Sequence, residues 1–222
     1  MKSIDTVIFD LDGTLLYTLE DLRDSVNYAL EQMHYPKRSL SEVQKFVGNG
    51  IYRLIERAVP EKTALQQVNQ TFEHFKAHYI VNCNNKTKPY DDIMVLLAEL
   101  KMRGYKLAIV SNKNQAAVEK LSAIYFKGLI EVSIGATETI HKKPAPDTVY
   151  KAIEALNSST EHAIYIGDSE VDIQTAVNAN IPYVSVSWGF RTTEFLKEQG
   201  ASTIIDTPLE LLTILEEVKT GV

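Results

Sequence analysis

The chain has 222 residues, 45% of them hydrophobic and 23% charged, which is typical of a folded protein with one sizeable core or a core plus a smaller companion domain. Its net charge of −6 argues against nucleic-acid binding, which needs a basic surface. No apolar run approaches the roughly 18 residues needed to span a bilayer, and the first residues lack the apolar segment of a signal peptide.

The first structural signal is the stretch at residues 4–15, I-D-T-V-I-F-D-L-D-G-T-L. It begins as a short apolar run rich in β-branched residues, which predicts a strand buried on both faces. The run stops at Asp10, Asp12 and Gly13. Neighbouring carboxylates at the end of a buried strand repel and are costly to desolvate, so we expect a metal ion there. Alternation along a strand would place Asp10 and Asp12 on the same side. The alternative is a loop-capping aspartate beside a turn aspartate.

Residues 16 to about 84 show helical spacing of apolar residues and no strand signal. Breaks at Pro36, at Gly48–Gly50 and at Pro60 divide this stretch into four helices, the last of them long and ending near Asn82. Thr18 with Asp21 is expected to cap the first helix, and Ser41 with Gln44 the second. We therefore expect an inserted four-helix cap domain at residues 16–87, within a core of residues 1–15 and 88–222.

From residue 88 onward, strand and helix signals alternate. Strands are expected at 106–110, 132–134, 163–166, 183–186 and 203–205, and helices at 91–103, 115–125, 146–156, 171–180, 193–199 and 208–218. Joined to the first strand, this pattern predicts an α/β fold with a doubly wound, Rossmann-like parallel sheet.

Polar residues follow several of these strands, where open α/β sheets bind ligands. They are Asp10 and Asp12, Ser111 and Asn112, Lys143 in H-K-K-P-A-P, and Asp168 and Asp172 in I-G-D-S-E-V-D. Each has an ordinary explanation alone, as a helix cap, a surface charge or a turn. Their joint occurrence at strand ends predicts one site.

The sequence resembles the haloacid dehalogenase-like hydrolases, in the phosphatase branch that has a small helical cap after the first motif. D-L-D-G-T-L, S-N, K-P-x-P and G-D-S-x-x-D occur in the family's order over the whole chain. F-V-G-N-G and W-G-F look like phosphoglycolate phosphatases and their relatives. Dehalogenating members lack a carboxylate at the second position of the first motif, so Asp12 implies phosphate chemistry.

The resemblance implies a role for each motif residue. Asp10 would be the nucleophile that forms an aspartyl-phosphate, and Asp12 the general acid and then base. Mg²⁺ would be bound by Asp10, the backbone carbonyl of Asp12 and Asp168, with Asp172 orienting a metal-bound water or Lys143. Ser111, the Asn112 backbone N–H and Lys143 would bind the phosphoryl oxygens. Lys142 is the rival of Lys143, which is preferred because it directly precedes Pro144.

The cap is expected to close over the site and to set substrate specificity. Asn49 and Gly50 lie in a polar break between apolar helices. Arg53 and Arg57 lie four residues apart and share a helix face, where they would bind a second anionic group of the substrate. The alternative is that both arginines are surface charges.

We therefore expect a Mg²⁺-dependent, cytoplasmic phosphoric monoester hydrolase acting on a small phosphorylated metabolite, with 2-phosphoglycolate as first candidate. A pyrophosphatase, a 5'-nucleotidase or a hexose-phosphate mutase would use the same motifs, and a catalytically silent binding protein is the alternative outside enzymes. We expect no nucleic-acid or membrane partner, and a monomer or homodimer. The one cysteine, Cys83, permits no disulfide within the chain, which fits a reducing compartment.

Overall fold

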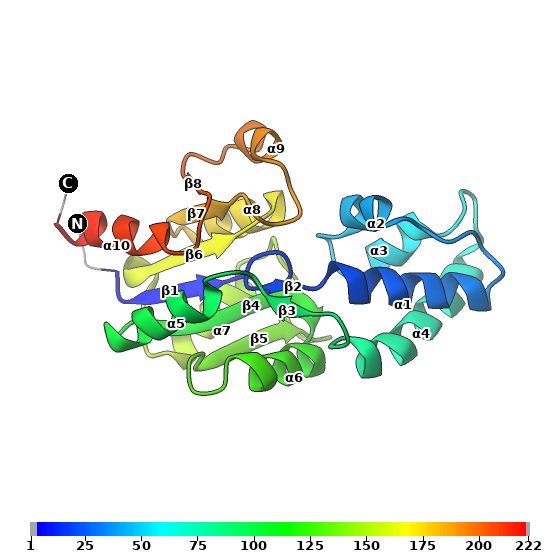
Figure 1. Ribbon diagram of the computed structural model, residues 1–222, viewed down its shortest axis with the longest axis horizontal. Coiled ribbons are helices and arrows are strands. Elements are labelled where there is room, and N and C mark those ends of the chain that lie inside the picture. Colours follow the sequence, from blue (N-terminus) through cyan, green and yellow to red (C-terminus); the bar gives the residue numbers. More distant parts are fainter. Residues whose placement is uncertain (1–3, 221–222) are drawn as a thin grey trace. The chain divides into compact units, whose positions relative to one another are not determined.

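The computed structural model describes residues 4–220 and divides into two compact units (Figure 1). One unit, called the helical unit below, is Tyr17–Lys88. The other, the α/β core, holds the rest of the described chain, from both sides of that insertion. The chain passes between the units through two short strands that pair with each other, β2 (Leu16–Tyr17) and β3 (Lys88–Pro89).

The core is built on a six-stranded sheet within the described residues, in the order β5-β4-β1-β6-β7-β8. All its neighbouring strands are parallel. The strands are β1 (Thr6–Phe9), β4 (Lys106–Asn114), β5 (Val132–Ala136), β6 (Ala163–Gly167), β7 (Tyr183–Val186) and β8 (Ile204–Ile205). The sheet confirms the doubly wound α/β architecture expected from the alternation. In register, Phe9 of β1 lies between Ile109 of β4 and Ile166 of β6.

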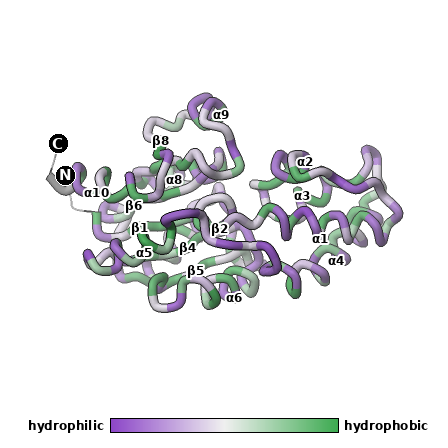
Figure 2. Tube along the Cα trace, viewed as in Figure 1, coloured by the Kyte–Doolittle hydropathy of each residue, from purple (hydrophilic) through white to green (hydrophobic). Residues whose placement is uncertain are grey.

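Helices cover both faces of this sheet. They are α5 (Ile93–Met102), α6 (Gln115–Tyr125), α7 (Asp147–Ala155), α8 (Glu170–Ala179), α9 (Thr193–Glu198) and α10 (Glu210–Thr220). Side chains of α7 and α8, including Val149 and Ala176, pack with Ile8, Val110 and Tyr165 in one buried cluster. Hydrophobic residues accordingly concentrate along the central strands (Figure 2). Because β1 is buried on both faces, its apolar run needs no alternation, as expected.

The helical unit contains α1 (Leu19–Gln32), α2 (Leu40–Phe46), α3 (Ile51–Ala58) and α4 (Leu65–Asn82). Apolar side chains from all four helices form its buried interior, among them Val26, Val43, Ile55 and Phe75. The turn before α3 needs glycine, because Gly48 and Gly50 have φ values of 131° and 84°. No helix in the described part of the chain is long and apolar enough to cross a membrane.

Two expected helix caps are wrong. Thr18 stands at the N-cap of α1 but makes no side-chain capping bond, because its backbone is helical (φ −110°, ψ −1°) and not extended as in a capping residue. The Asp21 carboxylate instead accepts the backbone N–H groups of Lys86 and Thr87. The cap of α2 is Ser39, which forms a reciprocal capping box with Glu42 two residues before the expected position. Before α2, both Ser39-x-x-Glu42 and Ser41-x-x-Gln44 satisfy the cap pattern, and the structure uses the first.

Candidate active site

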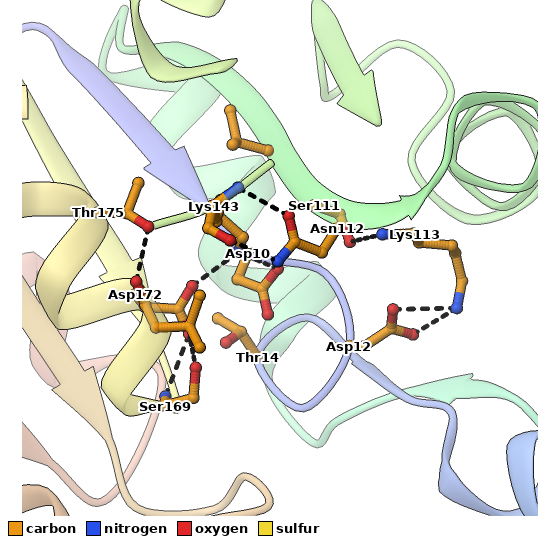
Figure 3. A network of polar contacts seen from close by, with 12 residues as sticks. Asp10, Asp12, Thr14, Ser111, Asn112, Lys113, Lys143, Ser169, Asp172 and Thr175 are labelled. Carbon is orange, nitrogen blue, oxygen red and sulfur yellow. Dashed lines mark hydrogen bonds and ion pairs between the residues drawn. The ribbon is translucent and has the colours of Figure 1, made fainter. Parts of the chain in front are cut away.

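The polar residues after the strands meet at one edge of the core sheet (Figure 3). Asp10 directly follows β1, Asp168 directly follows β6, and Ser111 and Asn112 lie near the end of β4. Lys143 comes from the connection between β5 and α7. Because the strands are parallel, their carboxyl ends lie at the same edge, and residues more than a hundred positions apart become neighbours.

Lys143 is the centre of this cluster. Its ammonium group donates hydrogen bonds to Asp10 Oδ1 and to Asp172 Oδ1, both at 2.7 Å, and to the Tyr165 hydroxyl at 2.9 Å. The Lys143 residue is only 6% exposed, whereas the neighbouring Lys142 is exposed. The structure therefore brings Lys143, and not its sequence rival, into the site.

Asn112 fixes the backbone that carries Lys143. The Asn112 Oδ1 atom accepts the Lys143 backbone N–H at 2.8 Å, and Asn112 Nδ2 donates to the Lys143 carbonyl at 3.0 Å. Ser111 lies next to it and accepts the backbone N–H of Lys113 through Oγ at 3.2 Å. Since this contact uses the Ser111 hydroxyl as an acceptor, its own O–H can donate to another group.

Asp168 is held on several sides. Its Oδ2 accepts the backbone N–H of Phe190 at 2.7 Å, and its Oδ1 accepts the Thr14 hydroxyl at 3.3 Å. A side chain at Gly13 or Gly189 would collide with it, because an added Cβ would lie 2.4 Å and 2.2 Å from Asp168 atoms, respectively. Both glycines are thus needed for the carboxylate to occupy this position.

Asp172 is positioned by the start of α8. Its Oδ2 accepts the backbone N–H of Ser169 at 3.1 Å and the Ser169 hydroxyl at 2.6 Å, which completes a capping box at the helix N-terminus. The other oxygen, Oδ1, accepts from Lys143 and from the Tyr165 hydroxyl at 3.1 Å. Both oxygens of Asp172 are therefore engaged by protein donors.

Asp12 lies apart from the other carboxylates, against the expectation from strand alternation. Its two oxygens accept from Lys113 Nζ at 2.7 and 2.9 Å, and the carboxylate points toward Lys113 and away from Asp10 (Figure 3). The period-two rule fails because β1 ends at Phe9 and the chain turns at Gly13, where φ is +95°.

The electrostatics of the cluster are dominated by burial. Burial raises the pKa of Asp10 well above its usual value. The positive charge of Lys143 lowers this pKa, and the negative charges of the nearby carboxylates raise it further. Burial and the neighbouring Asp172 raise the pKa of Asp168 to about 7. Burial acts to lower the pKa of Lys143, but Asp10 and Asp172 outweigh it and hold the pKa well above its usual value. The lysine is thus a permanent cation among carboxylates that need further positive charge.

The residues of this cluster fit a divalent cation. Asp10, Asp168 and Asp172 each offer one oxygen, and these three atoms lie within 4.8 Å of one another. Carboxylate oxygens are the ligands that hard divalent cations prefer. A bound cation would also favour the ionised forms that burial opposes at Asp10 and Asp168.

The residues expected to set specificity lie in the helical unit. Arg53 forms an ion pair with Glu56 at 2.7 Å, and its side chain is 65% exposed. Arg57 donates to the Phe46 carbonyl at the end of α2, at 2.8 Å. Asn49 and Gly50 form the turn that starts α3.

Sequence reasoning overlooked three residues of the core site. Lys113 directly follows Ser-Asn, but the apolar run that predicts the strand ends at Val110, so the hydrophobic pattern gives no signal at the lysine. Tyr165 lies in the apolar run A-I-Y-I, where its hydroxyl was hidden by the hydrophobic pattern. Thr14 belongs to the first motif itself and donates to Asp168. Of these three residues, Lys113 is the one with a usable sequence signal, because it directly follows the Ser111-Asn112 motif.

Comparisons with known proteins agree with this geometry. The family model described as haloacid dehalogenase-like hydrolase matches residues 7–186. A protein of Aquifex aeolicus named phosphoglycolate phosphatase is 30% identical over 211 residues, covering 95% of this chain and 96% of the relative. One of the same name from Colwellia psychrerythraea is 32% identical over 223 residues, covering 97% and 99%.

A solved structure from Lactobacillus delbrueckii subsp. bulgaricus has the same fold, with a TM-score of 0.92 at 34% identity. The match covers 96% of this chain and 99% of that one. The sequence match and the shared fold therefore both extend over nearly the whole chain. The chain belongs to the haloacid dehalogenase-like hydrolases, among their phosphoric monoester hydrolases.

Proposed function

We propose that the protein is a Mg²⁺-dependent phosphatase that hydrolyses a small phosphorylated metabolite through an aspartyl-phosphate on Asp10, with 2-phosphoglycolate as the first candidate substrate. One observation carries the mechanism. Asp10, at the end of β1, has one oxygen bonded to the Lys143 ammonium, and this lysine is fixed in turn by Asp172. A carboxylate held in one orientation beside a permanent cation is suited to attack a phosphate dianion, which a bare carboxylate would repel.

In the first step, an Asp10 carboxylate oxygen attacks the phosphorus of the monoester. The new Asp10 O–P bond forms while the bond from phosphorus to the leaving oxygen breaks, and the Asp12 carboxyl gives its proton to that oxygen. The product alcohol leaves, and Asp12 remains as a carboxylate. Lys143, the Ser111 hydroxyl and the Asn112 backbone N–H bind the phosphoryl oxygens as charge develops on them.

In the second step, water attacks the phosphorus of the aspartyl-phosphate. Asp12 takes a proton from that water, the Asp10 O–P bond breaks, and inorganic phosphate leaves with Asp10 restored as a carboxylate. Asp12 is then protonated, ready for another molecule of ester. The two steps together consume one water for each phosphate ester.

Asp10, Asp168 and the backbone carbonyl of Asp12 would hold Mg²⁺. Asp172 stays outside the ligand set in this proposal, because protein donors already engage both of its oxygens. When bound, the ion supplies positive charge that lets the substrate dianion approach the carboxylates. Asp172 then orients Lys143, as its 2.7 Å hydrogen bond indicates.

The substrate assignment rests on the relatives named phosphoglycolate phosphatase, which match the chain over almost its full length. The helical unit is proposed to close over the site as a cap. Its contacts suggest different roles for the two arginines, since Arg53 forms an exposed ion pair and Arg57 donates to the carbonyl at the end of a helix. Asn49, Gly50 and Arg53 are therefore proposed to meet the part of the substrate remote from phosphate.

The proposal includes a cytoplasmic location and a monomer or homodimer. The single cysteine supports the location, because Cys83 is buried and free within the described residues, as expected in a reducing compartment.

The proposed function is tested by phosphate release from a panel of about 100 phosphorylated metabolites, without an added bisphosphate. We expect steady release from 2-phosphoglycolate, loss of activity with a chelator, and inhibition by excess Ca²⁺, which prefers more ligands at longer distances than Mg²⁺. Asp10→Asn should abolish turnover, whereas Asp12→Asn should bind Mg²⁺ almost normally and lose about 10²–10⁴-fold in rate. Full activity after exhaustive chelation would refute the proposal, and dependence on an added bisphosphate would indicate a mutase.

A further inference from the structure

Lys113 is a buried cation that the mechanism above does not use. The residue is 4% exposed, and its Nζ donates to both oxygens of Asp12, at 2.7 and 2.9 Å. Asp12 lies in the loop after β1, whereas Lys113 lies on β4. The two-point contact therefore fixes the side chain of the proposed general acid to a neighbouring strand.

This contact holds Asp12 in an unproductive orientation. The carboxylate points toward Lys113 and away from Asp10 (Figure 3). In an in-line displacement the leaving oxygen lies on the side of the phosphorus opposite Asp10. To protonate it, the Asp12 side chain must leave Lys113 and turn toward the bound ester. Turning takes the carboxylate away from a buried ammonium, which is unfavourable unless another anion replaces it.

The substrate can supply that anion. Because Asp12 protonates the leaving oxygen, the leaving group must lie on the Asp12 side of the phosphorus, which is also the side of Lys113. In an ester such as 2-phosphoglycolate, a carboxylate is separated from the leaving oxygen by one methylene group. It would therefore arrive close to the Lys113 ammonium when the ester occupies the site.

We propose that Lys113 is a specificity-determining residue that retains Asp12 until an anionic group next to the leaving oxygen takes its place. This inference rests on the proposed function, because it assumes that Asp12 is the proton donor. Lys113 keeps its protons throughout and exchanges only hydrogen-bond partners. Asp12 is a carboxylate while it is paired with Lys113. It takes up one proton from solvent as it turns and gives that proton to the leaving oxygen. The preferred substrates are then phosphate monoesters with a carboxylate near the leaving oxygen, and esters without such a group react more slowly because they offer no anion in exchange for Asp12.

The test compares two esters that differ only at the group facing Lys113, 2-phosphoglycolate and 2-hydroxyethyl phosphate. The wild type should prefer the first, and Lys113→Met should lower the ratio of the two kcat/KM values at least about 10-fold. Lys113→Arg, which keeps a cation and its hydrogen-bond donors, should retain most of the preference. Lys142→Met removes the same charge from an exposed position and should leave the ratio unchanged.

An unchanged ratio in Lys113→Met, or an equal change in Lys142→Met, would overturn the proposal. A second measurement needs no Lys113 variant and therefore does not depend on its folding. In a crystal structure of Asp10→Asn with 2-phosphoglycolate, Lys113 should contact the substrate carboxylate and lie beyond about 4 Å from Asp12. An intact Asp12–Lys113 pair in that complex would also overturn it. Failure of the proposed function differs, because it would appear as turnover by Asp10→Asn.

Discussion

Asn112 and Lys143 are joined by a reciprocal pair of hydrogen bonds, side-chain amide to backbone, at 2.8 and 3.0 Å. Through it, the end of β4 sets the backbone position of the lysine that contacts Asp10. The side chain of Asn112 thus acts on the site by holding another residue, separately from the role proposed for its backbone N–H.

Replacing Asn112 by alanine should therefore misplace Lys143. We expect kcat to fall roughly 10²-fold, because displacement of a catalytic group by about 1 Å costs this much. Asn178→Ala is a matched control, since Asn178 Nδ2 donates to the next carbonyl, that of Pro144, from an exposed position. Steady-state kinetics of both variants check the prediction, and equal losses would show that Asn112 only supports the loop.

The fold was predictable because its signals are local and repeated. Helix α6 begins and ends where the sequence pattern indicated, at Gln115 and Tyr125. By contrast, β4 continues to Asn114, although the apolar run ends at Val110. The extension carries Ser111, Asn112 and Lys113, whose polar side chains conceal a strand from any rule based on hydrophobicity.

The site was predictable only where motif residues stand at strand ends. The position of Asp10 beside Lys143 follows from the parallel sheet, but the direction of Asp12 does not. That direction depends on a turn at Gly13 and on a lysine about 100 residues later, and neither is encoded in the local spacing. The same applies to Tyr165, whose hydroxyl contacts Lys143 from within an apolar strand.

Gly13 should be essential because of its contact with Asp168. In Gly13→Ala, the new Cβ would lie 2.4 Å from Asp168 Oδ2, so the carboxylate must shift and Mg²⁺ affinity should fall. Gly200→Ala is the matched control, because Gly200 has φ +96° and no atom within 4 Å of an added Cβ. Both variants should lose about 1 kcal/mol of stability from backbone strain. Calorimetric Mg²⁺ titration should show a loss only in Gly13→Ala, and equal affinities would contradict this.

Mg²⁺ binding should weaken at low pH. Burial and Asp172 raise the pKa of Asp168 to about 7, so in the metal-free protein its carboxyl holds a proton below that pH. Mg²⁺ must displace this proton, and its apparent Kd should rise up to about 10-fold per pH unit below pH 7. The raised pKa also affects the stability of the metal-free protein. Between pH 3.8 and about 7 the folded state binds more protons at Asp168 than the unfolded state does. The free energy of unfolding therefore falls as the pH rises through this range.

Thermal unfolding with and without Mg²⁺ measures this linkage. The increase in Tm caused by a fixed Mg²⁺ concentration should be larger near pH 8 than near pH 6. An increase that is equal at both values, or larger at the lower one, would exclude Asp168 as a metal ligand with a raised pKa.

The two arginines of α3 should respond differently to substitution. To contact a substrate, Arg53 must break its exposed ion pair with Glu56, which is worth about 0–1 kcal/mol. The side chain can therefore turn at little cost. Arg53→Ala should lower kcat/KM for 2-phosphoglycolate by more than about 10-fold and spare an aryl phosphate.

Arg57→Ala should instead destabilise the helical unit by about 1 kcal/mol, because Arg57 donates to the Phe46 carbonyl. Kinetics with both esters and thermal unfolding separate the two effects. If Arg53→Ala lowers activity on both esters equally, Arg53 supports the fold and does not bind the substrate.

The central claim is that Asp10 carries the phosphoryl group between the two steps. Its most direct test is to quench the enzyme with acid during turnover of 2-phosphoglycolate and to map phosphorylated peptides by mass spectrometry. With an aryl phosphate, whose leaving group needs no proton from Asp12, Asp12→Asn should accumulate the intermediate, because the variant lacks the base that activates water in the second step. We predict one phosphoryl group on the peptide that contains Asp10, and none in Asp10→Asn. Phosphate release with no phosphorylated Asp10, in the wild type and in Asp12→Asn alike, would contradict the account.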